Sequence, residues 1–73
     1  MKSQFTFGYK LSEEAATKIA KKLDFVAELA HGQFIYEYDH NCTTFIAPRK
    51  LGMRKYMRCE AFCMGYKLSD MGI

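Results

Sequence analysis

Five side chains of this sequence have the chemistry of metal ligands or nucleophiles: His31, His40, Cys42, Cys59 and Cys63. Structural zinc sites usually join two tight pairs such as C-x2-C, whereas Cys59-x3-Cys63 and His40-x-Cys42 are spaced differently. A Cys–His nucleophile also needs an orienting group and an oxyanion hole, and the closeness of His40 and Cys42 in sequence supplies neither. We therefore expect ordinary thiols, with no metal, no cofactor, no small-molecule substrate and no enzymatic activity.

A second group of functional side chains lies in the C-terminal third, where positive charge is concentrated. Residues 1–47 contain five Lys and six acidic residues, a sum of −1, and residues 48–73 contain six Lys or Arg and two acidic residues, a sum of +4; together they give the net charge of +3. Charge asymmetry of this kind informs about partners rather than about fold. It predicts a partner-binding surface made of Arg49, Lys50, Arg54, Lys55, Tyr56, Met57 and Arg58.

This basic segment has three interpretations. Its cations and Tyr56 could neutralise phosphates and stack a base, although no glycine-rich phosphate loop or known nucleic-acid signature accompanies them. It could also be a solvated face that only keeps the protein soluble. A protein interface is the interpretation we favour, because adaptable thioethers are suited to binding surfaces and four of the five methionines lie in this third, namely Met53, Met57, Met64 and Met71. A small basic RNA- or DNA-binding protein is the alternative.

The overall composition is that of one small domain. Seventy-three residues leave room for a single domain, and a hydrophobic content of 49% argues against full disorder. Three cysteines are an odd number, which does not fit a disulfide framework. Residues 1–7 lack the apolar run of a signal peptide, and no stretch of 18 apolar residues could span a membrane. We therefore expect a protein of the reducing cytoplasm that has no contact with the membrane.

The clearest structural pattern lies near the N-terminus. Residues 4–9 alternate between aromatic and other side chains, which predicts a strand with its rings on one face. Ser12, followed by two glutamates, predicts the start of a helix over 12–23. Leu11 precedes this cap and is placed to pack on Ala16 as a hydrophobic staple.

Three further strands are predicted after this helix, over 25–30, 33–38 and 42–47. Turns at His31-Gly32 and at 39–41 separate them. Aromatic residues at alternate positions of the second of these strands are expected to face the helix. The order β-α-β-β-β predicts an α+β fold, with a small antiparallel sheet and one packed helix.

The segment 49–73 fits two patterns. As a helix over 53–64, it places its two cysteines on one stripe and ends at a C-cap at Gly65. As a strand it alternates equally well, and periodicity alone does not decide between the two. Residues 67–73 have the composition of a frayed tail. We therefore expect an α+β core over 1–48, and a basic C-terminal segment that belongs to the same domain or is partly disordered.

The whole chain, from MKSQFTFGYKLSEEAATKIAKKL through PRKLGMRKYMRCEAFCMGY, resembles small bacteriophage proteins that bind the host RNA polymerase, of the type found in a lytic Xanthomonas phage. The resemblance lies in length and overall sequence, and it transfers no site residues. It implies binding to the beta-prime subunit near the RNA exit channel, inhibition of initiation by displacement of sigma, and antitermination aided by NusA close to nascent RNA. It also implies the host bacterial cytoplasm. An inhibitor of another host enzyme would have a similar sequence, so that alternative stays open.

Overall fold

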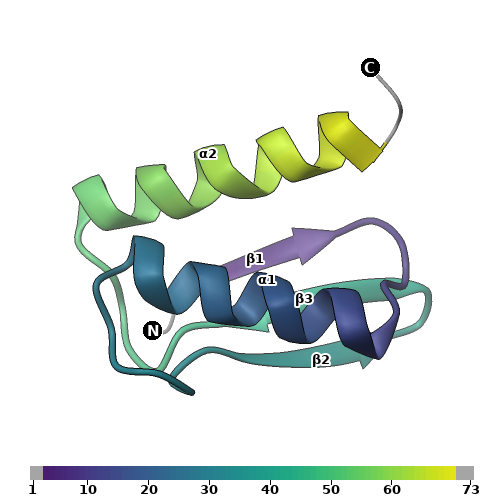
Figure 1. The fold of residues 1–73 in the computed structure, drawn as a ribbon, viewed down its shortest axis with the longest axis horizontal. Coiled ribbons are helices and arrows are strands. Elements are labelled where there is room, and N and C mark those ends of the chain that lie inside the picture. The colour runs from purple at the N-terminus through teal and green to yellow at the C-terminus, as the bar shows by residue number, and fades with distance from the viewer. Residues whose placement is uncertain (1–2, 71–73) are drawn as a thin grey trace.

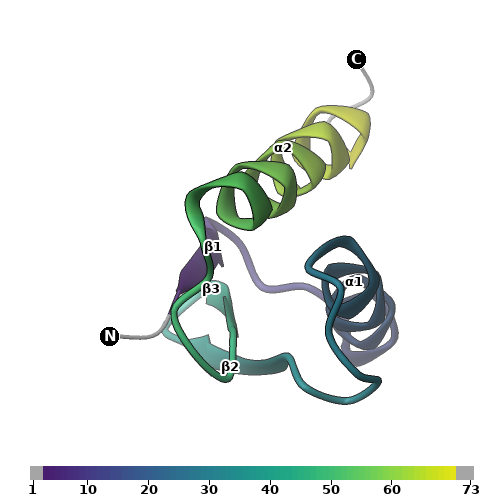
Figure 2. The ribbon, with the colours of Figure 1, turned by 90° about the vertical axis from the view of Figure 1, so that its left-hand side faces the viewer.

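The computed structural model describes residues 3–70 and shows an α+β fold with an antiparallel sheet, as predicted. The elements are, in chain order, β1 (Gln4–Phe7), α1 (Glu13–Val26), β2 (Ile35–Asp39), β3 (Cys42–Ile46) and α2 (Met53–Asp70). The strands form one sheet in the order β1-β3-β2. Both helices lie on the same side of this sheet, with α1 across its face and α2 beside β1 (Figure 1; Figure 2). The predicted order β-α-β-β-β therefore contains one strand too many and lacks the second helix.

Helix α1 begins where the sequence predicts. The Ser12 side chain accepts a hydrogen bond from the Ala15 N–H at 3.1 Å, which satisfies one of the free amides of the first turn. Two glutamates follow in that turn, where the helix dipole favours negative charge. The inner face of the helix is an apolar stripe at helical spacing, formed by Ala16, Ile19, Ala20 and Leu23.

The predicted strand over 25–30 is wrong, because α1 continues into it and then turns sharply. Glu28 has a left-handed conformation (φ 59°), and the Leu29 N–H donates to the Asp24 carbonyl at 2.8 Å. The Glu28 N–H donates to the Phe25 carbonyl at 3.1 Å, and the two bonds together form a Schellman cap. A short apolar run can continue a helical stripe as well as it can form a strand, and here it does the former.

The loop after α1 is held by the Asp24 carboxylate, which no sequence pattern singles out. Its two oxygens accept hydrogen bonds from the Gly32 N–H at 2.9 Å and from the Phe34 N–H at 2.7 Å. The side chain is 3% exposed, and bonds to a buried charged group are stronger than neutral ones. Gly32 has φ +84°, so the turn predicted at His31-Gly32 does need glycine. It leads from the helix into β2 rather than joining two strands.

Strands β2 and β3 form a hairpin, as predicted, but its turn is shorter than the predicted 39–41, because Asp39 belongs to β2 and pairs with Cys42. His40, in the turn, has φ 57°. A buried hydroxyl connects this hairpin to the segment before α1. The Thr43 hydroxyl accepts a hydrogen bond from the Leu11 N–H at 2.9 Å and donates one to the Tyr9 carbonyl at 3.1 Å. The Tyr38 hydroxyl donates to the Leu11 carbonyl at 2.8 Å. Three hydrogen bonds therefore fix the entry to the helix against the sheet.

The structure selects the helical pattern for the basic segment, in which α2 covers Met53–Asp70. Cys59 and Cys63 lie one turn apart on one stripe of α2, as the helical pattern predicts. The structure shows that this stripe faces inward and that both thiols are buried. Together with Leu51 they belong to the same hydrophobic core as the sheet and α1. The Leu51 N–H also donates to the Ser3 hydroxyl at 2.9 Å, which joins the start of the segment to the start of the chain.

The end of α2 differs from the prediction. The expected C-cap at Gly65 is wrong, since the helix continues through this residue. The reason is tertiary, because the Tyr66 ring packs against the Phe7 ring at 6.0 Å and extends the buried face beyond the glycine. The expected fraying is wrong for 67–70, which are helical, and 71–73 lie outside the described residues.

Candidate protein-binding surface

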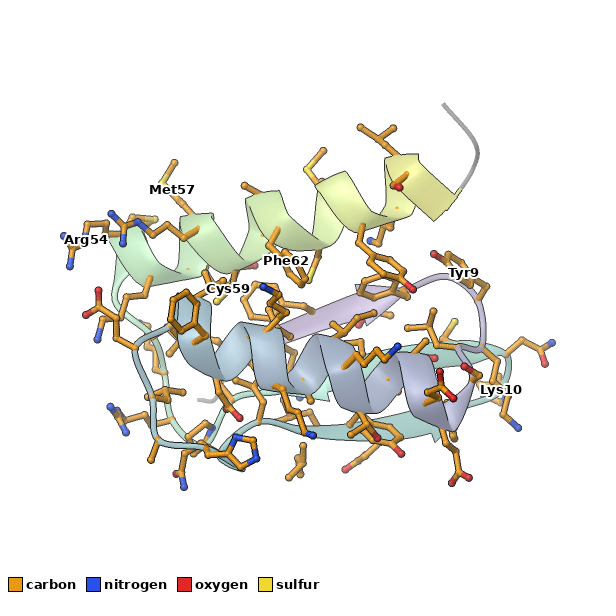
Figure 3. The ribbon with its side chains drawn as sticks, viewed as in Figure 1. Tyr9, Lys10, Arg54, Met57, Cys59 and Phe62 are labelled. Atoms are coloured by element: carbon orange, nitrogen blue, oxygen red, sulfur yellow. The ribbon has the colours of Figure 1, made fainter. Side chains whose placement is uncertain are left out.

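The outer face of α2 carries a row of exposed apolar side chains. Met53, Met57, Met64 and Leu68 recur at intervals of four, seven and four residues, which places them on one stripe of a helix. Their exposed fractions are 74%, 58%, 57% and 51%. Met57 points away from the body of the protein, while Cys59 points toward it (Figure 3). We refer to these four exposed residues as the methionine stripe.

The methionine stripe contains four of the six large hydrophobic side chains that are exposed among the described residues. Only two other large hydrophobic side chains within 3–70 are exposed, Phe25 and Ile35. Contiguous exposed apolar surface usually marks an interaction site, whereas single exposed residues are normal. The flexible thioether of methionine can fit partner surfaces of varied shape. The stripe is therefore the best candidate for a protein-binding surface in this fold.

Four of the seven predicted partner-binding residues are exposed to solvent and make no ion pair within residues 3–70. They lie at or before the first turns of α2. Met57 belongs to the methionine stripe, and three exposed cations accompany it: Arg49, Lys50 and Arg54. Within residues 3–70 none of these three cations forms an ion pair. Arg54 projects from the same end of α2 as Met57 (Figure 3). These charges are free to meet an acidic partner surface.

The other three predicted residues make contacts within the protein. The Tyr56 ring is half-buried and lies 5.0 Å from the Phe5 ring, so it packs inward instead of serving as an outward anchor. Lys55 and Arg58 both reach Glu28 at the end of α1, with N–O distances of 3.7 and 3.8 Å. Ion pairs this exposed contribute little to stability, but they place both cations against the Glu28 carboxylate.

Phe25 is a surface feature that the sequence patterns missed. Its ring is 78% exposed near the end of α1. A groove of about 520 Å³ runs from it toward α2, lined by Phe25, Val26, Glu28, Arg58 and Ala61. The other side of the ring borders three lysines of α1, namely Lys18, Lys21 and Lys22. A helix extended by three residues from the predicted end places Phe25 on this lysine face, so the helix boundary was the signal that could have found it.

The five potential ligands or nucleophiles are not brought together. Within 3–70 no three His, Cys, Asp or Glu side chains are close enough to hold a metal ion. His40 lies in the exposed hairpin turn, 3.6 Å from the Asp39 carboxylate. Burial raises the pKa of the Cys59 and Cys63 thiols to about 11, so both are protonated near neutral pH and react poorly.

Thiol reactivity is expected to follow this burial. A thiol reagent at about pH 8 should modify the half-buried Cys42 in the folded protein, and Cys59 and Cys63 only after unfolding. Mass spectrometry with and without urea counts the modified thiols. Rapid modification of all three without urea would contradict the buried core.

The same burial predicts how the free energy of unfolding depends on pH. From pH 9.0 to about 11 the thiols of the unfolded chain ionise, while the buried thiols of the folded protein stay protonated. The stability that these thiols contribute is therefore fully present below pH 9.0 and should fall as pH rises.

No protein-family model, curated protein or solved structure matches this chain. The part of the chain between residues 3 and 70 has no helix both long and apolar enough to cross a membrane. The described arrangement, an adaptable apolar stripe with free cations at one end, is suited to binding the surface of another protein.

Proposed function

We propose that this protein is a phage-encoded regulator that binds the host bacterial RNA polymerase in the host cytoplasm and does not act as an enzyme. The observation that carries the proposal is the methionine stripe, an exposed apolar row on a helix whose opposite face is in the core. The identity of the partner comes from the resemblance of the chain to small phage polymerase-binding proteins. On that basis the partner surface is the beta-prime subunit in the RNA exit region.

The proposed mechanism is occupation of a surface that the polymerase needs for other partners. Arg49, Lys50 and Arg54 would steer the protein toward an acidic or mixed surface, since charge complementarity mainly raises the association rate. The methionine stripe would then supply the apolar contact that keeps the complex together. Binding in this region displaces sigma and inhibits initiation. In elongation, together with NusA and close to nascent RNA, it promotes antitermination.

One observation favours a second function, direct binding of single-stranded RNA or DNA. The exposed Phe25 ring lies beside three lysines of α1, an arrangement in which a base could stack while the lysines contact phosphates. Such binding weakens steeply with salt, because each phosphate contact releases counterions. This surface lies on α1, whereas the methionine stripe lies on α2, so the two functions can be tested separately.

Binding to purified Xanthomonas RNA polymerase, measured at low salt, tests the first function. We expect the unmodified protein to bind the core enzyme and its isolated beta-prime subunit. The triple variant Arg49→Glu, Lys50→Glu and Arg54→Glu should bind about tenfold more weakly, because its steering charge is reversed. Since these side chains are exposed and form no ion pair within 3–70, the fold should be unaffected.

The matched control reverses three lysines on α1, as Lys18→Glu, Lys21→Glu and Lys22→Glu. It changes the net charge equally, so a loss of polymerase binding confined to the first variant assigns the effect to α2. A labelled single-stranded RNA is titrated in parallel with all three proteins. Failure of the unmodified protein to bind polymerase would refute the first function, and RNA binding lost only in the lysine variant would establish the second.

A further inference from the structure

The two edge strands of the sheet differ in whether another element covers them. The edge at β1 lies beside α2, and the Lys67 ammonium donates a hydrogen bond to the Thr6 carbonyl at 3.0 Å. Within residues 3–70, no strand or helix lies beyond the edge at β2 (Figure 2). Uncovered edge strands are templates for pairing with another chain, and proteins usually cover or charge them. The open edge at β2 therefore requires an explanation.

Hydrogen-bond alternation identifies the main-chain groups that face outward on β2. In an antiparallel sheet a central strand turns alternate residues toward each neighbour. The Ala47 N–H donates to the Ser3 carbonyl at 2.9 Å, so the main-chain N–H and C=O groups of odd-numbered residues in and next to β3 point toward β1. The main-chain groups of the even-numbered residues of β3 therefore point toward β2, where they pair with Ile35, Glu37 and Asp39. The N–H and C=O groups of Tyr36 and Tyr38 are thus left at the free edge.

These four outward groups have no hydrogen-bond partner within residues 3–70. The open stretch has defined ends. The next outward N–H on the N-terminal side, that of Phe34, is already bound to the Asp24 carboxylate at 2.7 Å. On the C-terminal side the hairpin turn at His40 ends the strand. The outward N–H and C=O groups of Tyr36 and Tyr38 are therefore available to pair with one short strand alongside β2.

Charge on the bare face of the sheet restricts which strand can bind. This face of β2 presents three exposed side chains, Ile35, Glu37 and Asp39. If a second copy paired antiparallel through all four outward groups, Glu37 would lie opposite the Glu37 of that copy. Like charges directly opposite each other are destabilising. A strand with basic side chains at these positions would instead be attracted, and an apolar residue could cover the half-exposed Ile35.

We propose that β2 binds an extended segment of a partner protein that adds a fourth strand to the sheet. The segment carries Lys or Arg at alternate positions, opposite Glu37 and Asp39, and an apolar residue opposite Ile35. Tyr36 and Tyr38 bind its main chain through their N–H and C=O groups, the usual source of affinity in strand addition. This site lies at the far edge of the sheet from α2 and does not depend on the identity of the polymerase as partner.

A displayed library of random ten-residue peptides, selected against the full protein, tests the proposal. We expect enrichment of peptides with Lys or Arg at every second position. Hydrogen exchange by NMR then examines a selected peptide. The amides of Tyr36 and Tyr38 should exchange fast in the free protein and become protected in the complex. Glu37→Lys should weaken binding about tenfold, while Glu60→Lys, the same change on exposed α2, should leave binding unchanged.

Each other outcome overturns the proposal. Failure to enrich any peptide, or peptides that protect other amides and leave Tyr36 and Tyr38 fast, excludes strand addition at β2. Equal binding by the Glu37→Lys and Glu60→Lys proteins excludes the charge-based choice of partner. Protection of the two amides without peptide, with a dimer in sedimentation, identifies a second copy as the occupant. None of these results bears on polymerase binding through α2, which is measured separately.

Discussion

Replacing Asp24 with alanine should lower the free energy of unfolding by about 3 kcal/mol. The carboxylate is 3% exposed and binds the Gly32 and Phe34 amides at 2.9 and 2.7 Å. Its loss removes two charge-assisted bonds and leaves the Phe34 amide buried without a partner. Small domains have a stability of about 5 kcal/mol, so this substitution should bring the protein close to unfolding.

Urea denaturation followed by circular dichroism measures this effect, with Glu60→Ala as the control. Glu60 is exposed on α2, and its replacement should change the free energy of unfolding by less than about 0.5 kcal/mol. Asp24→Asn keeps the size of the side chain and one acceptor oxygen, so it should fall between the two. If Asp24→Ala is no more destabilising than Glu60→Ala, the carboxylate does not hold the loop.

Replacing both Met57 and Met64 with glutamine should weaken polymerase binding about thirtyfold, equivalent to about 2 kcal/mol. Both side chains lie in the methionine stripe and are more than half exposed, so their apolar surface is available for burial only against a partner. Glutamine is similar to methionine in size and in helix propensity. The free energy of unfolding should therefore change by less than about 0.5 kcal/mol.

Calorimetric titration of the polymerase with each variant measures the affinity. Ile35→Gln is the matched control, because Ile35 is 51% exposed but lies on the sheet, away from α2. It should bind polymerase like the unmodified protein. An unchanged affinity of the double methionine variant, or an equal loss in Ile35→Gln, would show that the methionine stripe is not the interface.

The parts of the fold that sequence could predict depend on local physics. Ser12 caps α1 through an amide only three residues away, and the turn glycine Gly32 needs its own left-handed φ. Asp24 was not predictable, because its two amide partners lie eight and ten residues along the chain and are positioned by packing. From sequence alone, a carboxylate near the end of a helix is expected to be exposed to solvent, because its burial depends on how the following loop folds over it.

The candidate site was predictable in its charge but not in its shape. Counting residues located the basic segment, but both of its periodic patterns place Cys59 and Cys63 on one face. The patterns are separated by Met57, which would share that face in a strand but is exposed, while Tyr56 packs against a core formed elsewhere in the chain. Once α2 is known to be a helix, the outward direction of Met57 and the inward direction of Tyr56 follow from spacing. Phe25 was missed because its exposure depends on where α1 ends, and helix boundaries are set by tertiary contacts.

The hydrogen bonds of Ser3 have a consequence for the order of folding. Its hydroxyl accepts a hydrogen bond from an amide 48 residues away, and within residues 3–70 β1 pairs with β3 alone. The β2–β3 hairpin and α1 can form from near neighbours, whereas β1 must wait for closure of a long loop, whose entropy slows folding. We therefore expect β1 to dock late and to detach first. Contacts formed after the transition state govern the unfolding rate. We therefore expect the hydrogen bonds of Ser3 to govern how fast the native protein unfolds.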